Sequence, residues 1–175
     1  MTVAWPLSDA QPRWFHRLGQ PLTDAERTSA MAYLDAAGYY RNHLLIETAQ
    51  FWQEAMSIIH SPDWDARWWD AEESARKAPR AQAEKALGQQ AVLDQLTQAT
   101  ARTADALHEA ALRQCGDDDP ALIRAASGAP AMASNDAELA HLAGAAPEHL
   151  FMRKYEFYAL GRGPLGVLHN RFFLF

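Results

Sequence analysis

The segment from Arg80 to Gln114 constrains the fold of this chain more than any other feature. It is rich in Ala, Gln, Leu and Glu, which are good helix formers. Small or apolar side chains recur in it at alternating steps of three and four residues, at Leu93, Leu96, Thr100, Thr103, Leu107 and Ala110. This spacing predicts one long helix over 80–114, with Gly88 as a weak point near its start. Because the apolar stripe is narrow, we expect it to pack against neighbouring helices rather than form a free coiled coil.

Two further helices are predicted before this segment. Thr23 and Glu26 form a capping box, and Gly38 is a typical helix terminator, so the spacing predicts a helix over 23–38. Residues 39–60 combine a broad apolar sector with a polar stripe, which predicts a second, two-faced helix. The polar stripe consists of His43, Glu47, Gln50, Glu54 and Ser57.

Proline, glycine and capping residues predict shorter elements in the rest of the chain. The expected helices are a short one from Pro12 to Leu18, one beginning at Ser61-Pro62 that Pro79 ends or kinks, one beginning at Pro120, one from Asn135 to Ala143 and one from Pro147 through Tyr158. The expected loops are 116–119 and 128–134. Residues 167–175 are strongly aromatic and predict either a lone extended strand or a docking tail.

These elements together predict an all-α fold, an irregular bundle of about five to seven helices with one long central helix and an aromatic C-terminal tail. At 175 residues and 49% hydrophobic residues, the chain has the size and composition of one globular domain with a real core. We found no internal repeat and no domain boundary. The sequence therefore predicts a single helical domain over residues 1–175.

Charge and hydropathy limit the classes of partner. The net charge is −6, and no cluster of Lys and Arg is longer than two residues, which argues against a nucleic acid because several phosphates must be neutralised at once. No apolar run approaches the ~20 residues that span a bilayer, so a membrane partner is not expected. The N-terminus lacks the apolar core of a secretory signal, and Cys115 is the single cysteine. A cytoplasmic location is the simplest expectation.

Two carboxylate and histidine pairs suggest a metal site. Asp105 with His108, and Glu138 with His141, are three residues apart, so on a helix each pair projects to one side. Helical di-metal proteins use this geometry and add single carboxylates from other helices. Glu47, with His43 one turn before it, is the candidate for such a carboxylate. Pairs at this spacing also arise readily by chance, so exposed side chains on solvated helix faces are the alternative reading.

Glycine and aromatic residues near the C-terminus suggest two other features. Gly161, Gly163 and Gly166 have the spacing of a dinucleotide-binding fingerprint, but they follow a helical pattern and only nine residues remain, so we expect a turn. Phe172, Phe173 and Phe175 need cover from this domain, from a second copy or from another protein. If a partner provides that cover, these aromatic side chains are candidate partner-binding residues.

Three functional hypotheses follow from these features. The first is an accessory or interaction protein that binds a protein partner or self-associates through aromatic surfaces. The second is a metal-dependent helical enzyme that uses Glu47, His108, Glu138 and His141. The third is a small-molecule-binding bundle whose pocket is lined by Trp52, Trp64, Trp68 and Tyr155.

Overall fold

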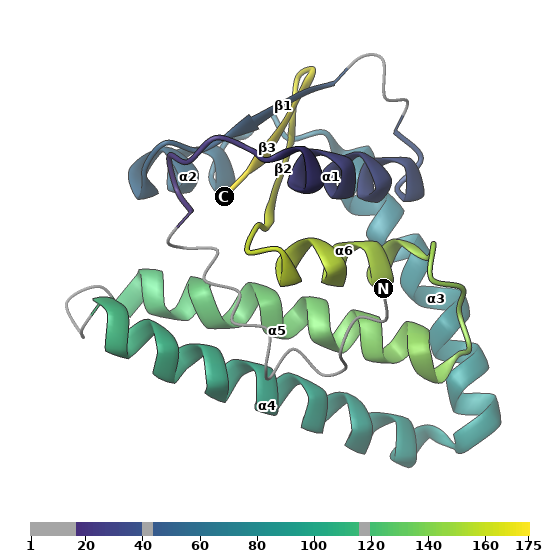
Figure 1. The fold of residues 1–175 in the computed structure, drawn as a ribbon. Helices are drawn as coiled ribbons and strands as arrows, with labels where there is room; N and C mark the ends of the chain where they lie inside the picture. The colour runs from purple at the N-terminus through teal and green to yellow at the C-terminus, as the bar shows by residue number, and fades with distance from the viewer. Residues whose placement is uncertain (1–16, 40–43, 116–119) are drawn as a thin grey trace.

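The computed structural model describes residues 17–39, 44–115 and 120–175 (Figure 1). These residues form six helices and a small three-stranded sheet. The elements are α1 (Asp24–Ala36), β1 (Leu45–Thr48), α2 (Trp52–Ile59), α3 (Ala66–Leu87), α4 (Gln89–Cys115), α5 (Pro120–Leu142), α6 (Leu150–Ala159), β2 (Pro164–Leu168) and β3 (Arg171–Leu174). The predicted helical class and helix number are confirmed, and the sheet is an addition to them.

The helices are arranged in layers (Figure 1). The long helices α4 and α5 lie side by side at one end of the molecule, and α6 lies between this pair and the layer that contains α1, α2 and the sheet. Helix α3 runs across one side and packs against α4, α5 and α6. The core therefore lies between the sheet and the helices, with a second contact zone between α4 and α5.

The sheet joins distant parts of the sequence. Its strand order is β1–β3–β2, so β1 and β2 are its edges. Strands β2 and β3 form an antiparallel hairpin, whereas β1 is parallel to β3, with Leu45 opposite Arg171 and Thr48 opposite Leu174. The C-terminal segment is thus the central strand, which explains the burial of Phe172 and Leu174.

The prediction of one helix over 39–60 is wrong for residues 45–51. Here the chain forms strand β1 and then begins α2 at Trp52. The residues that pair with β1 lie more than 120 positions later, so local periodicity carried no sign of them. Residues 40–43 lie outside the described residues.

The predicted long helix over 80–114 is divided at Gly88. This residue has φ +86°, a backbone conformation that favours glycine, and it separates α3 from α4. Pro79 neither ends nor begins a helix but lies inside α3, which is capped at Asp65 rather than at Ser61. The expected weak point at Gly88 thus became the actual boundary.

The predicted loop over 128–134 and the separate helix from Asn135 are also wrong, because α5 is continuous from Pro120 to Leu142. Ala131, Ala133 and Ser134 are buried, so the small residues that resembled a loop serve packing instead. Asn135 reaches across to α4, where its Nδ2 donates to Thr100 Oγ1 at 2.9 Å. Tertiary contacts here override the local cost of glycine and proline.

Several helix ends agree with the sequence. Thr23 and Glu26 form the expected capping box: Glu26 N donates to Thr23 Oγ1 at 3.3 Å, and Thr23 N donates to Glu26 Oε2 at 2.8 Å. Helix α5 begins at Pro120 as expected. Helix α6 begins at Leu150, later than the predicted Pro147, because His149 Nδ1 accepts from Phe151 N at 3.2 Å and caps it. The short helix expected from Pro12 lies mostly outside the described residues.

Candidate functional site

The predicted metal ligands lie on different elements. Glu47 is on β1, where its Oε2 accepts from Arg171 Nη1 at 3.0 Å. Asp105 and His108 are exposed on α4, whereas Glu138 is buried and His141 exposed on α5. Across residues 17–39, 44–115 and 120–175, no three His, Cys, Asp or Glu side chains are grouped as a metal site requires. His43 lies outside these ranges.

The aromatic tail docks on its own domain. Phe172 is 0% exposed and its ring stacks on Tyr33, with centroids 5.8 Å apart. Phe175 is buried and stacks on Trp52 at 6.0 Å, while Phe173 is partly buried. Two of the three candidate partner-binding rings are therefore committed to the core.

The glycine pattern serves the packing of the β2–β3 hairpin. Gly166 has φ +141°, and a Cβ there would lie 2.3 Å from the ring of Trp64. A Cβ at Gly163 would lie 2.6 Å from the ring of Tyr158. The predicted turn is present at Gly161, whereas Gly163 directly precedes strand β2 and Gly166 lies within it.

The residues of the suggested small-molecule pocket are separated. Trp64 and Trp68 contact each other at 5.5 Å between centroids, but Trp52 packs on Phe175 and Tyr155 packs on Ala137 in a different cluster. The two surface hollows described below are lined by none of these four residues.

A buried ionic network was not visible in the sequence, because its members span residues 33–154. Glu72 accepts from Tyr33 Oη at 2.7 Å and from Lys154 Nζ at 2.8 Å. Asp136 accepts from Arg76 Nε at 3.0 Å and from Arg76 Nη2 at 3.2 Å. Two carboxylates thus face two cations, and every carboxylate oxygen has a donor.

The protonation of Tyr33 fits this network. Burial raises the pKa of its hydroxyl well above the ordinary value, and the nearby Glu72 charge adds to the effect. The hydroxyl therefore stays protonated and donates to Glu72, while Trp68 Nε1 donates to it at 2.9 Å. An internally satisfied network that links four helices indicates a structural role.

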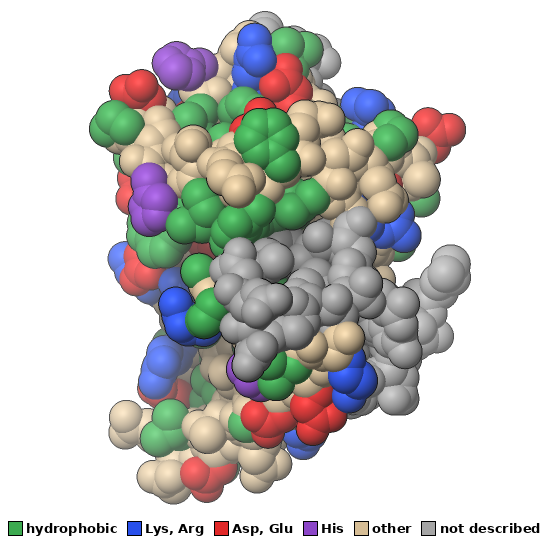
Figure 2. Space-filling model, turned by 90° about the vertical axis from the view of Figure 1, so that its left-hand side faces the viewer, with side chains coloured by type: hydrophobic (Ala, Val, Ile, Leu, Met, Phe, Trp, Pro, Cys, Tyr) green, Lys and Arg blue, Asp and Glu red, His purple; other side chains and the backbone are tan. Residues whose placement is uncertain are grey.

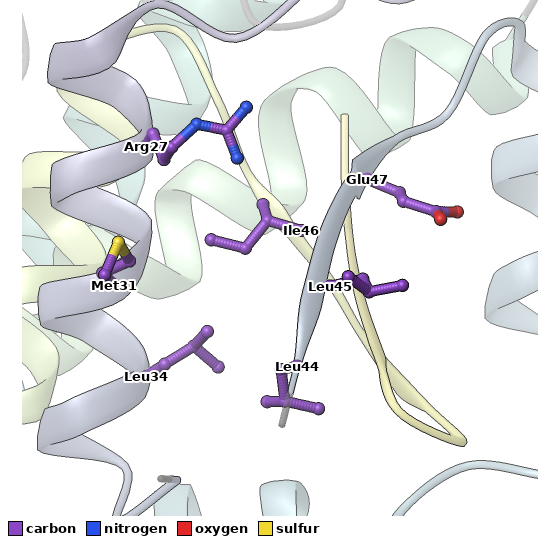
Figure 3. Close-up of a pocket in the computed structure, with 7 residues that line it drawn as sticks. All are labelled: Arg27, Met31, Leu34, Leu44, Leu45, Ile46 and Glu47. Atoms are coloured by element: carbon purple, nitrogen blue, oxygen red, sulfur yellow. The ribbon is translucent and has the colours of Figure 1, made fainter. Parts of the chain in front are cut away.

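The outer edge of β1, which pairs with no other strand in the part of the chain that the structure describes, borders the best candidate for a binding site; we call it the open edge. Two adjoining hollows of about 330 and 470 Å³ lie along it and share Arg27, Ile46 and Glu47. The first is also lined by Met31, Leu34, Leu44 and Leu45, and the second by Gly19, Pro21, Leu22, Thr48, Gln50 and Glu54. Together they form a groove between α1 and β1, which we call the α1–β1 groove (Figure 3).

The backbone of β1 directs the N–H and C=O groups of alternate residues outward from the edge of the sheet. Leu45 N donates to Asn170 O and Ala49 N donates to Leu174 O, so the odd-numbered residues face β3. In a parallel ladder the alternate residues direct their N–H and C=O groups to the opposite side. Ile46 and Thr48 therefore face the open edge, where Thr48 O accepts from Gln50 Nε2 at 3.0 Å. Among the described residues, nothing bonds to the main-chain N–H and C=O of Ile46, so both groups are available to a ligand.

The side chains of the groove divide into two sets (Figure 3). Arg27 and Leu34 of α1 and Ile46 of β1 extend into the space between the two elements, whereas Leu45 and Glu47 point away from α1. Leu45, on the face of β1 that points away from α1, is 55% exposed.

Apolar side chains also gather across the middle of one face of the molecule (Figure 2). The α1–β1 groove combines apolar lining with oriented backbone groups and one arginine. Such a combination is typical of binding sites.

No protein-family model matches this chain, and no curated protein or solved structure is significantly similar to it. None of the described helices has both the length and the apolar character needed to cross a membrane. The function therefore has to be inferred from the chemistry of the site.

Proposed function

We propose that this chain is an interaction protein that binds an extended segment of a protein partner as an additional strand beside β1. The observation that carries the proposal is the edge of β1 beside the α1–β1 groove: no other described strand pairs with it, and the N–H and C=O of Ile46 are directed away from β3 along it. Strand addition to an exposed sheet edge is a recurrent mode of peptide recognition, in which main-chain hydrogen bonds give affinity.

The side chains of β1 support the same proposal. Natural proteins protect exposed edges with very short strands, charged side chains (lysine above all), proline, bulges or covering elements, because an open edge is a template for pairing. Strand β1 has only four residues and carries Glu47, but this carboxylate is paired with Arg171 of the neighbouring strand β3. In β1 the exposed side chain at the start of the strand is Leu45, and neither a lysine nor a proline occurs among Leu45–Thr48. The side chains of an added strand would contact Leu45 on one face of the sheet. On the other face they would contact the residues that line the groove.

This proposal keeps the class of function that the sequence suggested and changes the surface. An interaction through Phe172, Phe173 and Phe175 loses support because two of these rings pack in the core. The enzyme and small-molecule alternatives gain no support from a grouping of their candidate residues. The edge of β1 instead offers the main-chain N–H and C=O of Ile46 beside an open groove.

The decisive variant is Ile46→Pro. Proline removes the N–H that faces the open edge but leaves the β1–β3 ladder, which uses Leu45 N and Ala49 N. Peptides selected from a displayed library of random heptamers on the wild-type protein should bind Ile46→Pro at least about tenfold more weakly, since one backbone hydrogen bond and the close approach of the strand are lost.

Two measurements accompany the binding assay. The melting temperature of Ile46→Pro shows whether the variant is folded, and amide signals of the wild type show where the peptide binds. Selected peptides should shift the signals of Ile46 and Thr48. Equal binding to a folded Ile46→Pro variant, or shifts confined to α4 and α5, would refute the proposal.

A further inference from the structure

The charge and lining of the α1–β1 groove identify the chemistry of its ligand, on the basis of the function proposed above. We infer that the bound segment carries an acidic residue whose carboxylate pairs with Arg27. Two positions away in the same segment it carries an apolar residue, whose side chain packs against Met31 and Leu34. The carboxylate belongs to an aspartate or glutamate within an extended protein segment.

Arg27 is the first part of this inference. Its side chain is exposed and extends into the groove toward β1 (Figure 3). No acidic side chain within the described residues pairs with it: Glu47 points to the opposite face and pairs with Arg171, and Glu54 Oε2 accepts from Gln50 N. An arginine guanidinium offers a planar fork of donors that matches a carboxylate.

The spacing of the groove is the second part. Arg27, Met31 and Leu34 follow one another at steps of four and three residues, so they share one face of α1. Along the helix axis Arg27 and Leu34 are about 10 Å apart, at roughly 1.5 Å per residue. Alternate residues of a strand are about 6.7 Å apart on one face. A carboxylate at Arg27 therefore places the next side chain of that face between Met31 and Leu34.

The apolar lining is the third part. Leu44 and Ile46 belong to the side of β1 that packs toward the core beneath α1. In an added strand, the side chains on this same face are directed toward α1 and contact Met31 and Leu34, which line the hollow. The ligand pattern is therefore an acidic residue and an apolar residue at positions i and i+2, in either order, because strand direction reverses the order.

A second copy of this chain fits the groove less well. Two β1 strands paired antiparallel about a two-fold axis would place Leu44, Ile46 and Thr48 of each copy on the α1 side. The carboxylate of β1, Glu47, would lie on the opposite face and away from Arg27. An acidic segment of another protein would place a carboxylate beside Arg27, which pairing with a second copy does not.

The test uses a blocked heptapeptide with the sequence Thr-Val-Thr-Glu-Thr-Val-Thr and its Gln and Lys analogues at the centre. The sequence reads the same in both directions, so it presents Val two residues from Glu whichever way the strand runs. Binding is followed by amide shifts of the labelled full-length protein up to millimolar peptide. We expect the Glu peptide to bind about two- to fivefold more tightly than the Gln peptide, as is typical of an exposed ion pair.

Variants of Arg27 complete the cycle. In Arg27→Gln the Glu and Gln peptides should bind alike, and Arg27→Glu should prefer the Lys peptide. Arg102→Gln, an exposed arginine on α4, is the matched control and should keep the preference for Glu. Added salt should reduce the preference in the wild type because it screens exposed charges.

The outcomes separate this inference from the proposed function. If Ile46→Pro loses both peptides while Arg27→Gln keeps the Glu preference, strand addition stands and the role of Arg27 is refuted. If Ile46→Pro binds both peptides normally, or no peptide shifts the Ile46 amide, the proposed function itself is refuted. A wild-type dimer that Ile46→Pro abolishes, without peptide binding, assigns the edge to a second copy and overturns the acidic ligand.

Discussion

Replacement of Phe172 by alanine tests whether the aromatic C-terminus is core or interaction surface. The ring is 0% exposed, stacks on Tyr33 and sits beside Leu174 on the central strand. Loss of a fully buried phenylalanine removes its transfer free energy and leaves a cavity, which together cost about 3–5 kcal/mol. For a chain of 175 residues, this corresponds to a decrease in melting temperature of roughly 6–20 °C.

Phe173→Ala is the matched control, because the same side chain is removed one position later from a partly exposed site. Urea denaturation followed by tryptophan fluorescence gives both unfolding free energies. We expect Phe172→Ala to lose at least about 2 kcal/mol more than Phe173→Ala. Equal losses, or a Phe172→Ala variant that keeps its stability but fails to bind a partner, would show that the tail is not core.

Two further predictions concern buried charges. Lys154→Met leaves Glu72 without its cation and should reduce the unfolding free energy by about 3–5 kcal/mol. Lys77 is exposed, so Lys77→Met should change this free energy by less than about 0.5 kcal/mol. Similar urea-denaturation midpoints for the two variants would contradict the prediction. Burial raises the pKa of Glu26, but hydrogen bonds with Thr23 and Arg162 outweigh it and hold the pKa below its ordinary value of 4.5. Because the folded-state pKa is the lower one, the stability from this carboxylate is complete above the unfolded-state pKa and is lost as the pH falls through the folded value. The unfolding free energy should therefore fall less between about pH 5 and pH 3 in Glu26→Gln than in the wild type, and parallel pH profiles would exclude this contribution.

Local sequence was sufficient for the helical class and for several helix boundaries. The capping box at Thr23 and Glu26 formed as its side-chain chemistry requires. Gly88 separates two helices because its positive φ is easily adopted by glycine. These features depend on residues three or four positions apart, and the hydrogen bonds of a helix have that same range.

Strand β1 could not be predicted in this way. Its polar stripe and apolar residues also fit a helix, and its ladder partners lie at 171–174. The continuity of α5 through 128–134 likewise depends on packing of its small residues against other helices. Local preference is weak at such positions, so the contacts formed in the folded chain decide the structure.

The candidate site belongs almost entirely to the tertiary structure. The sequence contained Glu47 as a candidate ligand, but it gave no sign that Ile46 faces an open edge or that Arg27 reaches toward it. Which side of a strand is free depends on where the other strands pair, and here that is settled by the C-terminal hairpin. The sequence determined the helices because their hydrogen bonds are local, whereas the groove exists only after residues 27, 46 and 172 have been brought together by burial.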